Sequence, residues 1–391
     1  MITPSLLFLI CALLAVQLLW DHRRVARALV DLRSVNGDEG PADLPSLSII
    51  RPTKGVDVEQ LENFRAALMV DYPGDVETLF VFEDAEDPAH ALAKQAVSEH
   101  VARGGHGRAR IVLAGPPPPE RTGKINNMIV GADASTGDVI AFGDSDTRPT
   151  QNLFRRLVSD LVAREDAGAI FAFPVTTPSP RTAGDVGYAV ILNAYLGAEM
   201  QAFAGQARTL PFLMGQTMLF RREALDAIGG VQCAEGQLVD DMFLGAQVAK
   251  AGYKNLLGRA PVSVINHGLP FADFYRLWRR WLFFGRGGIP LRFVVPMAWR
   301  GVSVFLALAL LCAAPVAALP VPLALVLAEG LHYLRLNRLV GGARIPARLV
   351  WMAWLPQPMA AWIAVSMLFN PTVEWRGRTY RLDLAARLRS G

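Results

Sequence analysis

Residues 139–146 read Val-Ile-Ala-Phe-Gly-Asp-Ser-Asp and place two carboxylates directly after a short apolar run. The run 139–142 is typical of a buried strand because it is brief and wholly apolar. Side chains two residues apart on an extended chain point the same way, so Asp144 and Asp146 can both reach one divalent cation that carries a diphosphate. The alternative is a solvated turn, since Asp and Ser are turn residues. We interpret the segment as a metal site at a strand end.

The sequence on the amino-terminal side of this stretch alternates between strand-like and helix-like patterns. Short apolar runs cover residues 47–50, 78–82 and 110–114, and helical spacing covers 58–69 and 88–102. This alternation predicts an α/β domain with a mostly parallel sheet, in which ligands bind at the carboxyl ends of the strands. No Gly-X-Gly-X-X-Gly follows the first strand and no Walker loop is present, which argues against a dinucleotide dehydrogenase or a P-loop enzyme.

Two further acidic segments occur in order along the chain. Glu83 and Asp84 follow the run 78–82, with Asp87 close behind, and Asp240-Asp241 comes much later. A diphosphate clamp followed by a later carboxylate that can act as a base predicts a nucleotide-sugar transferase. Asp87 before Pro88 also fits a helix N-cap. Either Asp240 or Asp241 can be the base, or both can cap a helix over 242–249, and two adjacent carboxylates raise each other's pKa.

A proline-rich loop at 116–119 leads into the start of a helix. The helix opens with Lys124, followed by Asn126 and Asn127. A lysine and an asparagine at a helix start near the sheet edge can contact a nucleotide or a phosphate. The alternative is a capped helix with a surface lysine.

The composition indicates a membrane-associated protein. Of the 391 residues, 52% are hydrophobic and 19% charged, and the net charge of +4 is too small to indicate nucleic acid as a partner. Residues 4–20 are apolar and about long enough to span hydrocarbon, and basic residues follow at 22–27. This flank predicts a signal anchor with everything downstream in the cytoplasm. The three cysteines are scattered, which supports neither a disulfide framework nor a zinc site.

Further apolar blocks at 301–334 and 349–369 predict a carboxyl-terminal membrane bundle whose number of spans stays open. The predicted organisation is a transmembrane anchor (1–22), a basic juxtamembrane linker (23–44), a catalytic domain (45–285), an interfacial segment (286–300), a transmembrane bundle (301–370) and a basic tail (371–391).

Several segments taken together resemble the ceramide glucosyltransferases, which are membrane-anchored inverting enzymes with the GT-A fold. Hopanoid-associated bacterial glycosyltransferases share a similar layout. The segments that carry the resemblance are 51–57 (RPTKGVD), 83–89 (EDAEDPA), 124–127 (KINN), 214–217 (MGQT), 227–230 (AIGG) and 239–241 (VDD).

The resemblance implies a role for each matching residue. Asp84 would lie by the uracil and ribose, and Asp241 would be the general base. Mg²⁺ or Mn²⁺ would be the cofactor. The residues implied in binding the nucleotide sugar are Lys54, Asp84, Lys124, Asn127, Asp144 and Arg280, and those implied in binding the metal are Asp144 and Asp146.

The last family motif reads Gln or Arg, two free positions, then Arg-Trp. Arg280 and Trp281 match, but Leu277 stands where the leading polar residue is expected. The resemblance implies that Arg280 pairs with the departing diphosphate and that Trp281 walls the acceptor pocket. Trp and Arg also gather at membrane headgroups, so an interfacial helix is an alternative that is compatible with this role.

The sequence therefore predicts an inverting transferase that moves a hexose, with glucose expected, from a UDP-sugar to a lipid hydroxyl. Ceramide is the expected acceptor, at the cytoplasmic face of a bacterial inner membrane. A hopanoid acceptor with UDP-N-acetylglucosamine is the main alternative, ahead of a processive polysaccharide synthase and a non-catalytic membrane scaffold. His267 follows a strand-like run and is either near the diphosphate or an ordinary turn residue.

Overall fold

The structure is a computed structural model of the whole chain. It describes residues 4–34, 43–119, 121–205, 207–237, 239–288, 306, 309–310, 312, 316, 319–370, 372–375 and 378–381.

The first half of the sheet is parallel, as the sequence predicts. Strand β1 (Leu47–Pro52) lies between β2 (Val76–Phe82) and β4 (Val139–Gly143), and β2 also pairs with β3 (Arg108–Leu113). The helices between these strands are α2 (Gln60–Leu68), α3 (Pro88–Ala102) and α4 (Gly123–Ala134). They confirm the predicted helices at 58–69 and 88–102 and the helix that opens near Lys124.

Alternation along β2 explains why helices cover both faces of this half. Phe80 and Phe82 pack with Phe64 under α2 and α3. Leu79 and Val81 point the other way and pack against Met128 of α4, among other residues. Burial on both faces requires continuous apolar strands, which is the pattern in the sequence.

The second half of the sheet is mixed, so the prediction of a mostly parallel sheet is wrong there. The strand order is β3-β2-β1-β4-β8-β6-β9-β5, with β7 also paired to β9. Strand β8 runs antiparallel to both of its neighbours, whereas β6 and β9 pair in parallel. The bounds are β5 (Thr147–Arg148), β6 (Ala167–Thr176), β7 (Thr209–Leu210), β8 (Thr217–Arg221) and β9 (Lys254–Val264).

Helices of this half place the remaining site residues. A continuous helical stretch comprises α6 (Ala183–Ala189), the π-helix η1 (Val190–Gly197) and α7 (Ala198–Ala204). The other helices are α5 (Leu153–Val162), α8 (Arg222–Ala227), the 3₁₀ helix η2 (Val231–Ala234), α9 (Asp240–Lys250) and α10 (Phe271–Gly288).

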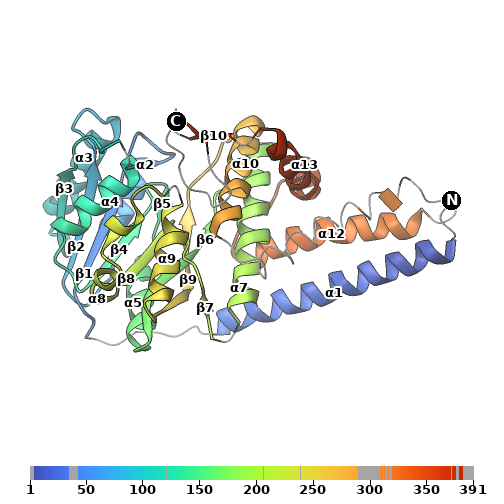
Figure 1. Ribbon diagram of the computed structural model, residues 1–391, viewed down its shortest axis with the longest axis horizontal. Coiled ribbons are helices and arrows are strands. Elements are labelled where there is room, and N and C mark those ends of the chain that lie inside the picture. Colours follow the sequence, from blue (N-terminus) through green and yellow to red (C-terminus); the bar gives the residue numbers. More distant parts are fainter. Residues whose placement is uncertain are drawn as a thin grey trace.

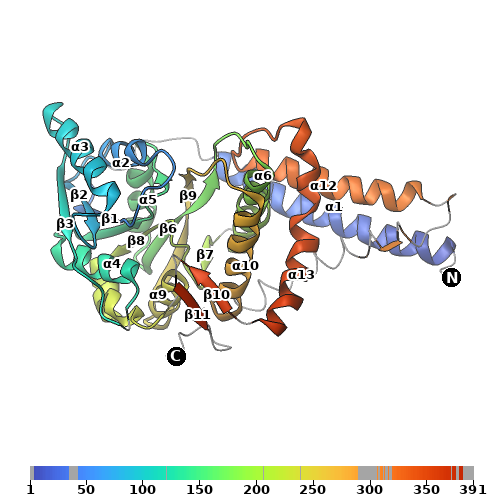
Figure 2. The ribbon, with the colours of Figure 1, turned by 90° about the horizontal axis from the view of Figure 1, so that it is seen from above.

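Two long helices form an arm beside the sheet domain. Helix α1 (Pro4–Ser34) and helix α12 (Pro320–Leu339) lie side by side and extend away from the sheet (Figures 1 and 2). Cys11 and Leu14 pack against Leu325 within this arm. Other apolar side chains of α1 face outward; Leu13 is 62% exposed and Trp20 63%.

No helix within the described ranges combines the length and the apolar run needed to cross a membrane. The transmembrane helices predicted at both ends are therefore not confirmed. Residues 289–305, which hold most of the predicted interfacial segment and the start of the predicted bundle, lie outside the described residues. The carboxyl-terminal elements are the 3₁₀ helix η4 (Ala347–Trp354), helix α13 (Pro356–Phe369) and the hairpin β10 (Thr372–Trp375) and β11 (Arg378–Arg381).

Candidate active site

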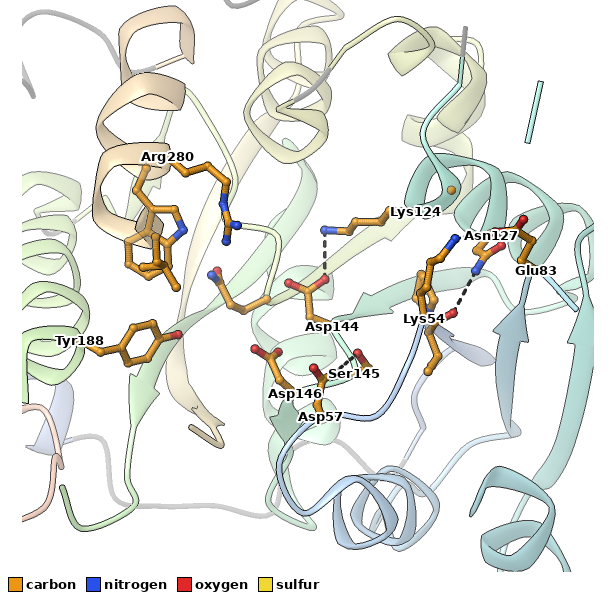
Figure 3. Close-up of a pocket in the computed structure, with 16 residues that line it drawn as sticks. Lys54, Asp57, Glu83, Lys124, Asn127, Asp144, Ser145, Asp146, Tyr188 and Arg280 are labelled. Atoms are coloured by element: carbon orange, nitrogen blue, oxygen red, sulfur yellow. Dashed lines mark hydrogen bonds and ion pairs between the residues drawn. The ribbon is translucent and has the colours of Figure 1, made fainter. Parts of the chain in front are cut away.

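A cavity of about 190 Å³ opens at the carboxyl ends of β1 and β4 (Figure 3). Its floor comes from the sheet edge and its opposite wall from α6 and α10. The lining residues are Pro52, Thr53, Lys54, Asp57, Glu83, Gly123, Lys124, Asn127, Asp144, Ser145, Asp146, Tyr188, Gln216, Leu277, Arg280 and Trp281.

The acidic turn at 144–146 is anchored by hydrogen bonds from several elements. The N–H of Asp144 donates to the carbonyl of Gln216 at 3.0 Å. The hydroxyl of Ser145 donates to Asp57 at 2.5 Å, and the Ser145 carbonyl accepts from Gln60 Nε2 at 3.1 Å. The turn is therefore fixed to the loop before α2 and to the loop before β8.

Arg51 stabilises the same turn from below. Its side chain is almost fully buried, and it donates to the Thr147 hydroxyl at 2.9 Å and to the Thr147 carbonyl at 2.8 Å. Burial lowers the pKa of the Arg51 guanidinium to about 10, although nearby carboxylates, Asp146 foremost, act in the opposite direction. Arg51 thus places a positive charge behind a strongly acidic turn.

Asp146 has the properties of a metal ligand. Its Oδ1 is buried and has no hydrogen-bond partner in the described part of the chain. Burial, together with the charges of Asp144 and Asp57, raises the pKa of Asp146 to about 7. A divalent cation at this oxygen would satisfy the atom and favour the ionised carboxylate.

A metal at this site would need ligands from the substrate in addition to the protein carboxylates. Among the described residues, no three His, Cys, Asp or Glu side chains are arranged to hold a metal by themselves. Mg²⁺ is commonly held by one or two carboxylates together with substrate phosphates. Asp144 and Asp146 fit a site of that kind.

Lys124 joins this turn to the second acidic pair. Its Nζ lies 3.0 Å from Oδ1 of Asp144 and 3.3 Å from Oδ2 of Asp240. Burial alone would lower the pKa of the Lys124 ammonium, but the carboxylates of Asp144, Asp240 and Asp241 outweigh burial and raise it. The lysine is therefore firmly cationic at neutral pH.

Asp241 lies next to this ion pair and is oriented by two backbone groups. Its Oδ2 accepts from the N–H of Gly215 at 2.7 Å, and its Oδ1 accepts from the N–H of Met242 at 2.8 Å. Burial and the neighbouring Asp240 raise the pKa of Asp241 to about 7, against the opposing effect of Lys124. A carboxylate with this pKa can accept a proton at neutral pH.

Helices α6 and α10 supply the wall opposite the acidic turn. Tyr188 is buried, and its ring lies 5.6 Å from that of Trp281. Figure 3 shows the Tyr188 hydroxyl directed toward Asp146, with the Arg280 guanidinium reaching over the cavity. Burial and the charges of Asp146 and Asp144 raise the pKa of Tyr188, so its hydroxyl stays protonated and can donate.

Comparison with known proteins identifies the family. Residues 6–388 match the model of glycosyl transferase family 21. The chain belongs to glycosyl transferase family 21. It is therefore a nucleotide-sugar glycosyltransferase.

Two curated proteins to which this family 21 enzyme is similar are ceramide glucosyltransferases. It is 23% identical to ceramide glucosyltransferase 3 of Caenorhabditis elegans over 354 residues, which cover 87% of this chain and 73% of the relative. It is 20% identical to ceramide glucosyltransferase 1 of the same organism over 249 residues, which cover 61% of this chain and 49% of the relative.

A solved structure supports the fold. The family 21 enzyme resembles the mannosyltransferase PcManGT from Pyrobaculum calidifontis, solved in complex with GDP-Man and Mn²⁺. The TM-score is 0.53 at 17% identity, over 93% of this chain and 99% of that chain. The likeness shows a GT-A-like α/β fold with a mixed sheet.

The family 21 fold gathers most of the predicted site residues around one cavity. Seven of them line it: Lys54, Lys124, Asn127, Asp144, Asp146, Arg280 and Trp281. Asp241 does not line it but lies beside Lys124, close enough for its charge to affect that lysine. Asn127 has a largely structural set of contacts, because its side-chain amide donates to the carbonyls of Thr53 and Val81.

The acidic segment after β2 is arranged differently from the prediction. Glu83 lines the cavity and pairs with Lys54 at 2.8 Å, whereas Asp84 is not among the lining residues and accepts from the N–H of Glu86. Asp87 is the N-cap of α3, with its side chain accepting from the N–H of Ala89. The N-cap interpretation of Asp87 is therefore confirmed.

Other residues of the site were not singled out from the sequence. Asp57 was part of a matching segment, and its place a few residues beyond the end of β1 could have indicated the same sheet edge. Tyr188 lies in an apolar stretch of sequence, and nothing local separates it from a core residue. His267 is not a lining residue; its Nε2 lies 2.9 Å from Oε1 of Glu59.

Proposed function

We propose that this enzyme transfers a hexose from a UDP-sugar to the hydroxyl of a membrane lipid. The proposed hexose is glucose and the proposed acceptor is ceramide. The residues of the site support the transfer chemistry, and the similarity to two ceramide glucosyltransferases supports the acceptor.

One observation carries the transfer chemistry. Three segments that are far apart in the sequence come together here. The turn at 144–146 and the Arg280-Trp281 wall line the cavity, and Asp240 of the Asp240-Asp241 pair contacts Lys124, which also lines it. The arrangement provides carboxylates for a cation, a carboxylate with a pKa near neutrality and a guanidinium for a leaving diphosphate.

The proposed reaction is a single displacement. The acceptor oxygen attacks the anomeric carbon from the face opposite the diphosphate, and the bond between that carbon and the diphosphate oxygen breaks. The acceptor proton passes to Asp241, and UDP leaves with the bonding electrons. Arg280 would pair with the developing negative charge on the diphosphate. One displacement converts an α-linked donor into a β-linked product.

Asp144 and Asp146 would hold a Mg²⁺ or Mn²⁺ ion together with the diphosphate. When bound, the ion would neutralise charge on the leaving group. The buried, unpartnered Oδ1 of Asp146 and the all-oxygen donor set support this assignment.

A membrane location is proposed from the arm. Helices α1 and α12 expose a set of large apolar side chains that a lipid environment would cover. They are Leu6, Phe8, Leu9, Leu13, Val16, Leu19 and Trp20 on α1, and Val321, Leu323, Leu327 and Leu331 on α12. The catalytic domain would then act at the cytoplasmic face of that membrane.

A substrate matrix tests the proposal. Purified enzyme with Mg²⁺ or Mn²⁺ would be given UDP-glucose, UDP-galactose or UDP-N-acetylglucosamine, each with ceramide or bacteriohopanetetrol, and lipid products would be read by mass spectrometry. Hexosylceramide that disappears in Asp241→Asn supports the proposal. Product on the hopanoid alone would keep the chemistry and overturn the acceptor. No product and no UDP release with any pair would contradict UDP-sugar transfer.

A further inference from the structure

The ammonium group of Lys124 lies between carboxylates from two separate parts of the fold. Asp144 stands at the end of β4 and Asp240 in the first turn of α9, and Lys124 reaches both from the first turn of α4. The three side chains are mostly shielded from water, with exposed fractions of 21% for Lys124, 32% for Asp144 and 10% for Asp240. Solvent and salt therefore screen the ion pairs of Lys124 with Asp144 and Asp240 much less than they screen an ion pair at the surface.

The surroundings of Lys124 are strongly acidic. Asp57, Asp144 and Asp146 act on the charge of Arg51, and Asp144, Asp240 and Asp241 act on the charge of Lys124. Arg51 acts on the turn at 144–146 through Ser145 and Thr147. Lys124 contacts both acidic segments, through Asp144 and Asp240, so its loss would leave the start of α9 repelled by the turn.

Gly215 lies very close to both Lys124 and Asp241. A Cβ atom at residue 215 would lie 3.1 Å from Oδ2 of Asp241 and 3.3 Å from Nζ of Lys124. The loop before β8 therefore packs directly against the lysine and the second aspartate. Lys124 occupies the centre of a tightly fitted contact among α4, α9 and the turn.

We propose that Lys124 is a positioning residue that holds the first turn of α9, and with it Asp241, against the metal-binding turn before the metal and the donor bind. The inference rests on the proposed function for the roles of Asp144, Asp146 and Asp241. Lys124 supplies part of the positive charge that the acidic cluster needs, so the cluster forms without a bound cation.

This role predicts a specific interplay with a divalent ion. Removal of Lys124 leaves buried carboxylates uncompensated and lowers stability. It also removes a cation that repels the metal from Asp144, so the metal should bind and stabilise the variant more than it does the wild type. A lysine that only contacts the donor phosphates would show neither effect, because its contribution would appear only when donor is present.

The test compares thermal unfolding of the full chain as wild type, Lys124→Met, Lys124→Arg and Lys94→Met, each in EDTA and in Mn²⁺. Lys94 is an exposed residue of α3 and serves as the matched control. We expect Lys124→Met to lose about 5 °C or more in EDTA, to gain more from Mn²⁺ than the wild type does, and to have a lower kcat. Lys124→Arg should recover part of the loss. An unchanged melting temperature in EDTA, or an equal Mn²⁺ shift in both proteins, would overturn the proposal.

A double variant keeps the test decisive if Lys124→Met is too unstable to handle. Asp240→Asn removes a carboxylate that Lys124 neutralises, so the pair Lys124→Met/Asp240→Asn should be more stable than Lys124→Met alone. Losses that simply add would contradict the coupling. Wild-type turnover of UDP-sugars, measured on the same preparations, separates the two proposals: its absence rejects UDP-sugar transfer, while the EDTA comparison still decides the role of Lys124.

Discussion

The carboxylate of Asp241 is held in place by the backbone of Gly215, whose N–H donates to Oδ2 at 2.7 Å. Any side chain at residue 215 would press on this contact, since an added Cβ would lie 3.1 Å from the same oxygen. Real Cβ contacts are rarely so short, so the loop and α9 approach this closely because residue 215 is glycine. The orientation of the proposed base thus depends on a residue with no side chain.

Gly215→Ala should therefore reduce turnover without unfolding the protein. The alanine methyl would displace Asp241 by a few tenths of an ångström, and small misplacements of a catalytic group are costly, so we expect kcat to fall about tenfold. The KM for the UDP-sugar should change less. Steady-state kinetics, with a melting curve to confirm folding, measure both. An unchanged kcat would show that the position of Asp241 does not matter.

The rate should also depend on the protonation of Asp241. Burial raises the pKa of this carboxyl to about 7, with the charge of Asp240 acting in the same direction. A general base works only when deprotonated, so kcat/KM should be near its plateau above pH 8 and fall about tenfold for each pH unit below 7. The assay needs saturating metal, so that Asp146 stays ionised throughout the titration.

Asp240→Asn distinguishes the two candidate bases. The substitution removes a negative charge that raises the pKa of Asp241, so the acid limb should move to lower pH. Part of the activity should remain, reduced by the loss of the contact between Asp240 and Lys124. Asp133→Asn, an exposed change of the same charge, should leave the limb in place. Complete loss of turnover in Asp240→Asn with an intact fold would instead assign the base to Asp240.

The parallel half of the sheet could be predicted because each of its strands is recognisable from a short stretch of sequence. Strands β1, β2 and β4 each contain a short apolar run, as burial on both faces requires, and a polar residue follows it, whereas the edge strand β3 is partly exposed. The direction of β8 could not be predicted in this way, because the sequence of its five residues is compatible with both parallel and antiparallel pairing. The mixed second half depends on tertiary contacts between β8, β6 and β9 that no local pattern encodes.

The site residues also divide into those that local sequence predicts and those that depend on tertiary packing. Asp144 and Asp146 were predictable because a strand end fixes where their side chains go. Glu83 and Asp84 both follow β2 directly, and the sequence pattern does not distinguish Glu83, which lines the cavity, from Asp84, which does not. Tyr188 is one of many buried residues of its helix, and its place in the cavity depends on how α6 packs against α10.

Arg51 offers a test of how the acidic turn is supported. Arg51→Met would leave the Thr147 hydroxyl and the carbonyls of Thr147 and Ser145 without this donor, beside carboxylates that have lost a counter-charge. We expect a loss of about 3 kcal/mol in the free energy of unfolding, measured by urea denaturation. Arg103→Met, whose side chain is 66% exposed, is the matched control and should cost far less.

Two buried asparagines link the arm to the catalytic domain. Asn193, within the π-helix η1, donates to Oδ1 of Asn337 on α12 at 2.7 Å, and Asn337 donates to the Ala343 carbonyl at 2.8 Å. Asn193 also exchanges hydrogen bonds with the backbone of Thr176 at the end of β6. This network connects the arm to the sheet through a helix that also carries Tyr188 into the cavity.

Asn337→Ala should weaken this junction. The substitution removes a partner from the buried amide of Asn193 and from the Ala343 carbonyl, so we expect the free energy of unfolding to fall by about 2 kcal/mol. Urea denaturation followed by tryptophan fluorescence would measure the loss, with the exposed Asn152→Ala as control. An equal effect of the two substitutions would contradict the role of the network, because a buried unsatisfied amide costs more than a solvated one.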